Sequence, residues 1–191
     1  MSSPRRRDRI GTAAGLFGWV TLAYLAGAVL AWQSFGAGVG PAFFPPAGVT
    51  LAAMVLNPRS RWPVIVAAIV LAEFAVDLRY GSSPGVAAGL ALANSVEPVI
   101  GASLLLAWCR GVPDLRERLD LGKFVAAGCV AAPLAGGLIG GAVTTVQHGI
   151  WFPAAVLHWW AGDGIGVLVV AAPILLWPKQ SHVLRARPAE T

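Results

Sequence analysis

Six long apolar stretches, separated by short polar segments, dominate the pattern of residues along the chain. A hydrocarbon core about 30 Å thick is crossed by about 20 apolar residues in helical conformation, and the stretches have roughly that length. The pattern therefore predicts an all-α, polytopic transmembrane helix bundle with about six crossings. The expected crossings are residues 11–34, 41–57, 62–79, 84–108, 124–147 and 153–177.

The second stretch is interrupted by Pro45 and Pro46, because proline removes a helix hydrogen bond and clashes with the preceding turn. Only residues 46–57 are predicted as uninterrupted helix, about 18 Å at 1.5 Å per residue, which is too short to span. An extended run over residues 41–45 adds about 16 Å at about 3.3 Å per residue. Such backbone survives at membrane depth only inside protein or along a wet cavity. A re-entrant hairpin is the alternative.

Composition supports a membrane protein and excludes a water-soluble globule. The 191 residues are 57% hydrophobic and 12% charged, against about 25% charged in soluble proteins. The 23 Gly and 8 Trp fit helices that pack through small residues and are anchored by interfacial indoles. The high apolar content also excludes intrinsic disorder.

The basic residues fall in alternate loops, which gives the predicted bundle two different sides. One side receives four Lys or Arg from residues 1–10, two from 58–61, four from 110–123 and three from 178–191, together 13 of 14. Only Arg79 lies on the other side. Because positive charge favours the cytoplasm, both termini are expected there. The chain is interpreted as one domain over residues 1–191, with a basic cytoplasmic start and a basic cytoplasmic tail.

Charge and motifs argue against several other classes of function. The net charge of +5 lies in short clusters without interleaved aromatic residues, so no nucleic-acid partner is expected. Cys109 and Cys129 are interpreted as reduced packing thiols rather than a disulfide or a metal pair. The histidines are too few and too separated for a transition-metal centre. No nucleotide-binding or hydrolase motif occurs, so we expect no enzyme, no metal and no cofactor.

Polar residues inside predicted crossings are the candidates for a site. A charged side chain at the bilayer centre costs at least about 2.5–3.5 kcal/mol on insertion scales, so each one needs a function or a buried partner. Counting from the outer helix ends places Asn94, Glu97 and Asp163 near mid-depth, with Glu73 and His158 nearer the outside. These side chains could therefore meet in one cavity.

The spacing of these residues indicates two shared helix faces. Asn94 and Glu97 are three apart, and Pro98 frees the Asn94 carbonyl from its helix hydrogen bond. Trp159 and Asp163 are four apart. Because no Lys or Arg lies at this depth, ionised acids would repel one another. The site should hold protons, a cation, or a ligand that donates hydrogen bonds.

Structural roles are the alternative for the same residues. Buried carboxyls can simply cross-link helices by hydrogen bonds. For Glu97 and Asp163 this structural role and a binding role are given equal weight. For Glu73 the structural role is favoured. His158 is more often an interfacial hydrogen-bonding residue than a ligand. Two overlapping G-x-x-x-G patterns in residues 136–141 are expected to pack inside the bundle rather than form a homodimer.

Four motifs, in this order and spacing, resemble the first membrane-associated sensor domain family over residues 43–173. They are FPPAG at residues 44–48, RWP at 61–63, ANSVE at 93–97 and WWAGDGIGVL at 159–168. The resemblance implies a bacterial inner (plasma) membrane location, multi-pass, and a sensory role ahead of histidine kinase, diguanylate cyclase or related output domains.

The resemblance also implies positions that the family favours. They are Pro45, Pro46, Gly48, Asn94, Glu97, Trp160, Gly162, Asp163 and Gly166. Two features differ from the family, whose members often have about eight crossings and are usually joined to an output domain. Here the last predicted crossing is followed by 14 residues, so no kinase or cyclase activity is carried over.

The sequence thus predicts an integral membrane sensory module that binds a small ligand or a cation in an intramembrane polar cavity. It is expected to signal to an output protein in trans. The predicted ligand-binding residues are Asn94, Glu97, Asp163, Trp159, His158, Glu73, Pro45 and Pro46. The alternative is a substrate-binding subunit of a transporter, because a broken crossing is a transporter feature and six crossings resemble the capturing subunits of vitamin importers. A third is a scaffold whose carboxyls only hold helices together.

Overall fold

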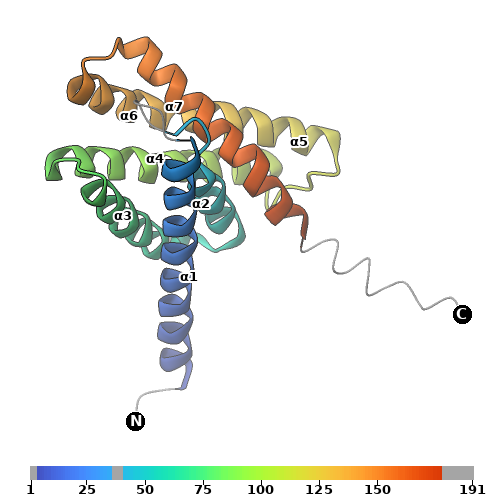
Figure 1. Cartoon of the computed structure of the whole chain (residues 1–191). Coiled ribbons are helices and arrows are strands. Elements are labelled where there is room, and N and C mark those ends of the chain that lie inside the picture. Colours follow the sequence, from blue (N-terminus) through green and yellow to red (C-terminus); the bar gives the residue numbers. More distant parts are fainter. Residues whose placement is uncertain (1–3, 36–40, 178–191) are drawn as a thin grey trace, which may run out of the picture.

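The computed structural model describes residues 4–35 and 41–177, and these residues form helices and no strand (Figure 1). The side chains of the predicted basic start and the whole of the predicted tail, 178–191, lie outside the described residues. The helices are α1 (Pro4–Phe35), α2 (Pro45–Leu56), the 3-10 turn η1 (Arg59–Arg61), α3 (Trp62–Arg79), α4 (Pro84–Cys109), α5 (Arg118–Phe124), the π-helical η2 (Val125–Ala131), α6 (Ala132–His148), α7 (Phe152–Gly166) and the π-helical η3 (Val167–Ala171).

Each predicted crossing corresponds to a helix, and the predicted all-α class is confirmed. Four helical segments are long and apolar enough to cross a membrane. They are Thr12–Ser34, Pro84–Cys109, Arg118–His148 and Phe152–Trp177. The remaining two are the 12-residue α2 and the 18-residue α3, which carries Glu73, Asp77 and Arg79. The number of six crossings and the side of the termini stay predictions.

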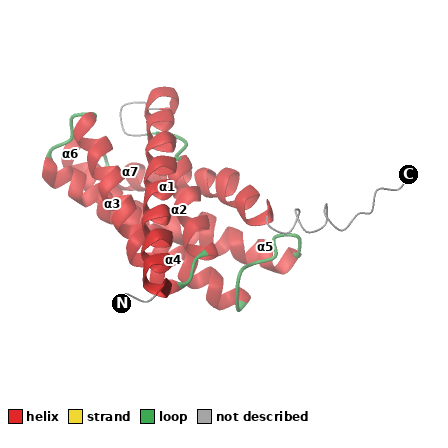
Figure 2. Ribbon diagram, turned by 90° about the horizontal axis from the view of Figure 1, so that it is seen from below, coloured by secondary structure: helices red, strands yellow, loops and turns green. Residues whose placement is uncertain are grey.

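The helices form a curved row with α2 enclosed by it. α1 packs on α3, α3 on α4, α4 on α6 and α6 on α7, while α2 contacts α1, α4, α7 and η3 (Figures 1 and 2). Ten of the 12 residues of α2 are buried. A short helix preceded by irregular backbone is therefore surrounded by protein, as such backbone requires at membrane depth.

The break in the second stretch lies just before the proline pair rather than within it. α2 begins at Pro45, one residue earlier than predicted, and the Phe44 backbone N–H donates to the Gly162 carbonyl of α7 (3.1 Å). At the other end of α2, the Arg61 side chain donates to Thr12 near the start of α1 (3.5 Å). α2 thus leads from the end of α1 that carries Trp32 back toward its start, which favours a crossing over a re-entrant hairpin.

Glycines explain why α2 and α7 approach so closely. A Cβ on Gly48 would lie 2.5 Å from the Gly166 carbonyl oxygen, and one on Gly162 would lie 2.8 Å from the Pro41 carbonyl oxygen. A Cβ on Gly166 would collide with the Phe44 carbonyl. Because backbone is the obstacle in each case, a side chain here would separate the two segments. The glycines of the FPPAG and WWAGDGIGVL motifs therefore allow one close backbone contact between α7 and α2 with the segment before it.

The glycines of α6 serve the packing of the bundle, as expected. A Cβ on Gly136 would meet the Glu97 side chain at 2.7 Å, and one on Gly140 would meet the Trp159 ring at 2.6 Å. Gly141 is equally close to Val156. The G-x-x-x-G face of α6 is thus occupied by α4 and α7 of the same chain.

Two prolines account for the π-helical turns. Pro133 lies two residues after η2, and Pro173 lies two residues after η3. Because a proline ring clashes with the carbonyl four residues earlier, a widened turn upstream relieves the crowding. In η2 the Val130 carbonyl accepts a hydrogen bond from the Trp160 indole (3.1 Å). Trp160 therefore points away from the face of Trp159 and Asp163.

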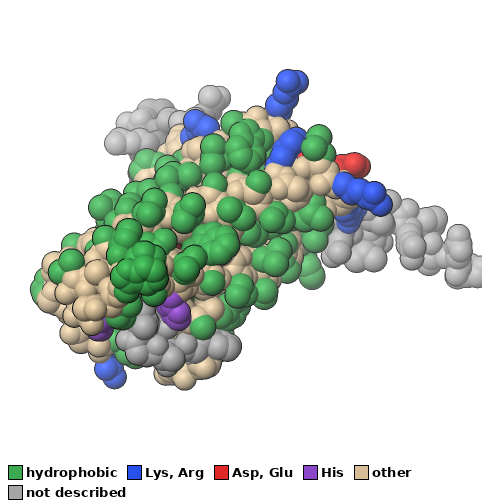
Figure 3. Space-filling view, turned by 90° about the horizontal axis from the view of Figure 1, so that it is seen from above, with side chains coloured by type: hydrophobic (Ala, Val, Ile, Leu, Met, Phe, Trp, Pro, Cys, Tyr) green, Lys and Arg blue, Asp and Glu red, His purple; other side chains and the backbone are tan. Residues whose placement is uncertain are grey.

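The surface has the character of a membrane protein. Figure 3 shows a face whose middle is covered by hydrophobic side chains, while Lys and Arg lie toward its ends. Large apolar residues such as Leu22 and Leu157 are 68% and 58% exposed. Such exposure is expected where lipid replaces water around the bundle.

Candidate functional site

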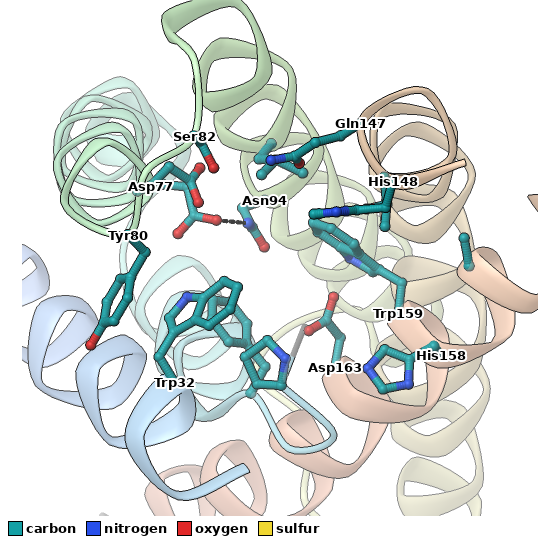
Figure 4. Close-up of a pocket in the computed structure, with 16 residues that line it drawn as sticks. Trp32, Asp77, Tyr80, Ser82, Asn94, Gln147, His148, His158, Trp159 and Asp163 are labelled. Atoms are coloured by element: carbon teal, nitrogen blue, oxygen red, sulfur yellow. Dashed lines mark hydrogen bonds between the residues drawn. The ribbon is translucent and has the colours of Figure 1, made fainter. Parts of the chain in front are cut away.

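A cavity of about 180 Å³ lies among the predicted outer halves of the helices, and Figure 4 shows the residues that line it. It extends from buried carboxyls to the exposed Tyr80 and His148 at helix ends. Its walls come from α1, α3, α4, α6, α7 and the segment before α2. The lining residues are Trp32, Pro41, Phe44, Glu73, Asp77, Tyr80, Ser82, Leu90, Asn94, Thr144, Gln147, His148, Ala155, His158, Trp159 and Asp163.

Glu73 is fixed by donors from two other helices. The Tyr24 hydroxyl of α1 donates to one carboxyl oxygen (2.8 Å), and the Asn94 amide of α4 donates to the other (2.6 Å). All three side chains are buried. The acid is thus held with both oxygens satisfied, and it ties α1, α3 and α4 together at the cavity wall.

Asp163 meets Glu97 behind the cavity wall. The Glu97 carboxyl of α4 lies against the Asp163 carboxyl of α7, and both residues are buried. Neither Glu97 oxygen has an N–H or O–H donor among the described residues. The two acids can therefore bond to each other only through a proton that one of them holds.

Three further polar atoms at the cavity have no partner in the described part of the chain. They are Oδ2 of Asp77, Oδ2 of Asp163 and Nε1 of Trp159. The Trp159 indole lies beside the Asp163 carboxyl, but its N–H has no acceptor in hydrogen-bonding geometry. A buried polar group without a partner is costly, so these atoms distinguish the cavity wall from a fully hydrogen-bonded interior.

Aromatic rings form the outer part of the wall. Trp32 of α1 stacks on Tyr80 at the end of α3, with ring centroids 5.2 Å apart and planes 19° apart. Deeper in, Tyr24 and Phe44 meet edge to face at 6.0 Å. Together with Trp159, these rings make the wall both apolar and rich in π-electrons.

The charge of the lining is one-sided. Glu73, Asp77 and Asp163 line the cavity, and no Lys or Arg is among the lining residues. Among the described residues, no group of three or more His, Cys, Asp or Glu is arranged to hold a metal ion. The arrangement suits protons or a ligand with donors better than a bare metal ion.

Five of the eight predicted site residues line this one cavity: Glu73, Asn94, His158, Trp159 and Asp163. Glu97 lies outside the lining, against Asp163. Pro45 and Pro46 also lie outside it; Pro46 packs where a Cβ on Gly27 would approach to 3.1 Å. The prolines instead start α2 so that Phe44, directly before them, forms part of the wall.

Several lining or supporting residues escaped the sequence analysis. Tyr24, Trp32, Tyr80 and His148 were not predicted; His148 ends α6 and lines the cavity. One signal was available for Tyr24. The chain has only 2 Tyr, and a hydroxyl in the middle of a membrane helix needs a hydrogen-bond partner.

Comparison with known proteins identifies a family match. The family model MASE1 matches residues 15–187, a longer stretch than the motifs alone covered. No curated protein and no solved structure is significantly similar to the chain.

Proposed function

Because the chain belongs to the MASE1 family of membrane-associated sensor domains, we propose that it binds a small ligand or ion in the cavity and relays the binding to an output protein. Family membership makes the chain an integral membrane sensory module. The ligand, the use of this cavity and the partner are the proposed part. The module is proposed to be non-enzymatic and to reside in the bacterial inner membrane.

One observation carries the proposal: Asp77 of α3 and Trp159 and Asp163 of α7 line the cavity, and each keeps a polar atom without a partner among the described residues. A buried polar atom without a partner raises the free energy of the bundle, and a ligand that bonds to it lowers that free energy. Because the cavity walls come from five helices, their exact packing sets the affinity. A ligand that binds one packing better than another shifts the population toward it.

The helices that line the cavity also provide a path for the signal. α4 runs from Asn94 in the wall to Cys109, directly before the basic segment 110–123. α7 and η3 run from Asp163 toward the same predicted cytoplasmic side. Glu97 and Asp163 link these two helices just below the cavity. A change in their contact would move the predicted cytoplasmic ends of both helices, and we propose that the partner contacts these ends.

Transport remains the alternative function. A transporter subunit would release its ligand on the other side or hand it to a partner, and a sensor would not. Uptake into liposomes by the purified chain, or by the chain with an ATPase, would support transport. Family membership favours sensing.

Cysteine labelling tests whether the cavity is open to the ligand. In a chain with Cys109 and Cys129 replaced by Ala, we substitute Ser82→Cys or Thr144→Cys, two lining residues, and apply a small membrane-impermeant thiol reagent to intact cells. Ala68→Cys is the matched control, because Ala68 is fully buried outside the cavity. Both lining cysteines should react. Reaction no faster than that of the control would overturn the proposed function.

A further inference from the structure

The unpaired atoms of the cavity indicate the chemical class of its ligand, an inference that rests on the proposed function. Asp77 and Asp163 are 2% and 3% exposed, and each keeps a carboxyl oxygen without a donor in the described residues. Figure 4 shows the two side chains on opposite sides of the cavity, with Asn94 between them. The ligand should therefore bring hydrogen-bond donors rather than acceptors.

The surrounding charges favour a cation over a neutral donor. Glu73 already has two donors, whereas Asp77 and Asp163 have no Lys or Arg beside them in the lining. A negative or acceptor-rich ligand would face these carboxyls without a compensating charge. A positive ligand instead gains from whichever of these carboxyls is ionised, in surroundings where charges are weakly screened.

Size and aromatic lining favour an organic cation over a metal ion. About 180 Å³ holds several water molecules, far more than a bare ion fills. The faces of Trp and Tyr rings attract ammonium groups, and they are the usual partners of alkylated ammonium ions. Trp32, Tyr80 and Trp159 supply such rings within the lining.

We infer that the cavity binds a small organic ammonium ion, with its N–H groups facing Asp77 and Asp163 and its carbon atoms against the aromatic wall. The ion is an alkylammonium of a few carbon atoms. It arrives from the outer side and supplies the donors that Asp77 and Asp163 lack among the described residues.

The test uses the full chain in lipid nanodiscs and two probes, methylammonium and propylammonium chloride; tetramethylammonium chloride is added as a cation without an N–H donor. Binding is followed by thermal unfolding and by tryptophan fluorescence, because Trp32 and Trp159 line the cavity. Propanol and sodium propionate are controls of similar size with no charge or the opposite charge. At least one ammonium probe should raise the melting temperature, and neither control should do so.

Variants then locate the binding. Asp77→Asn and Asp163→Asn should each weaken affinity for that probe about tenfold or more, since bonds to charged groups are worth about 1.5–3 kcal/mol. Asp120→Asn is the matched control, because Asp120 pairs with Lys123 outside the cavity (3.0 Å). If one cavity variant fails to fold, the other variant and the probe comparison in the unaltered chain still decide.

Three results would overturn the inference: no shift with any ammonium probe, an equal shift with propanol or propionate, or unchanged affinity in the folded Asn variants. If the Ser82→Cys and Thr144→Cys chains react with the thiol reagent and any of these results is found, the proposed function stands and only the assignment of an ammonium ion is rejected. If neither chain reacts, the proposed function and the ammonium assignment are both rejected.

Discussion

The carboxyl of Glu97 on α4 lies against the carboxyl of Asp163 on α7, with Gly136 of α6 leaving just enough space for the Glu97 side chain. Two carboxyls in contact attract each other only while they share a proton. This contact between α4 and α7 therefore depends on that proton. This contact lies directly below the cavity to which Asp163 also belongs. The same residue can therefore respond to a ligand and to its neighbouring helix.

A double-mutant cycle should detect this contact. Glu97→Leu or Asp163→Leu alone leaves the other acid buried without its carboxyl partner, whereas the double variant removes both. We expect the two losses in free energy of unfolding to be non-additive by about 0.6 kcal/mol, the average for hydrogen bonds inside a membrane protein, and by at most about 1.7 kcal/mol. Unfolding in mixed detergent micelles measures it. Losses that add within about 0.3–0.5 kcal/mol would show that the two residues act independently.

The close backbone contact between α2 and α7 should tolerate no added side chain. Gly166→Ala drives a Cβ into the Phe44 carbonyl, and Gly48→Ala drives one into the Gly166 carbonyl. We expect each to cost about 1–3 kcal/mol or more, as overpacking does, since backbone must move. Gly18→Ala is the matched control, because a Cβ there meets nothing within 4 Å and alanine favours the helix.

Thermal unfolding and the yield of monodisperse protein measure the effect of these alanines. The prediction is wrong if Gly166→Ala melts at the same temperature as Gly18→Ala. The comparison is sharp because all three substitutions add the same methyl group within helices.

The sequence predicted the elements well because the membrane imposes a simple pattern on them. Apolar length predicted helices at α1, α4, α6 and α7, and proline positions predicted the short, buried α2. The polar residues that the bilayer should exclude pointed to Glu73, Asn94 and Asp163, which do line one cavity.

What the sequence could not supply is the distance between helices. The spacing of Asn94 and Glu97 put them on one face, yet only Asn94 lines the cavity, because Asp163 of α7 covers Glu97. Trp32 and Tyr80 are 48 residues apart in sequence, and only the packing of α1 on α3 brings their rings together. Aromatic residues near helix ends otherwise look like ordinary interfacial anchors.

The hydroxyl of Tyr24 should matter more than that of Tyr80. Tyr24→Phe removes the donor to one oxygen of the buried Glu73, and we expect a loss of about 0.6–1.7 kcal/mol in the free energy of unfolding. Tyr80→Phe keeps the ring that stacks on Trp32 and should change stability by less than about 0.5 kcal/mol, as surface substitutions do. Equal losses in the two variants, measured by unfolding in micelles, would contradict this role of Tyr24.

Labelling of three loop positions should decide the path of α2 through the membrane. If α2 and the segment before it cross, Ser60 and Arg116 lie on the cytoplasmic side and Ser83 lies outside. If they form a re-entrant hairpin, every later segment is inverted, so Ser83 lies inside and Arg116 outside. The proximity of Arg61 to Thr12 at the start of α1 (3.5 Å) favours the crossing, as does the positive charge of the 110–123 segment.

In a chain without its native cysteines, Ser83→Cys should therefore react with an impermeant maleimide in intact cells. Ser60→Cys and Arg116→Cys should react only after permeabilisation, and the opposite behaviour of Ser83→Cys and Arg116→Cys would establish the hairpin.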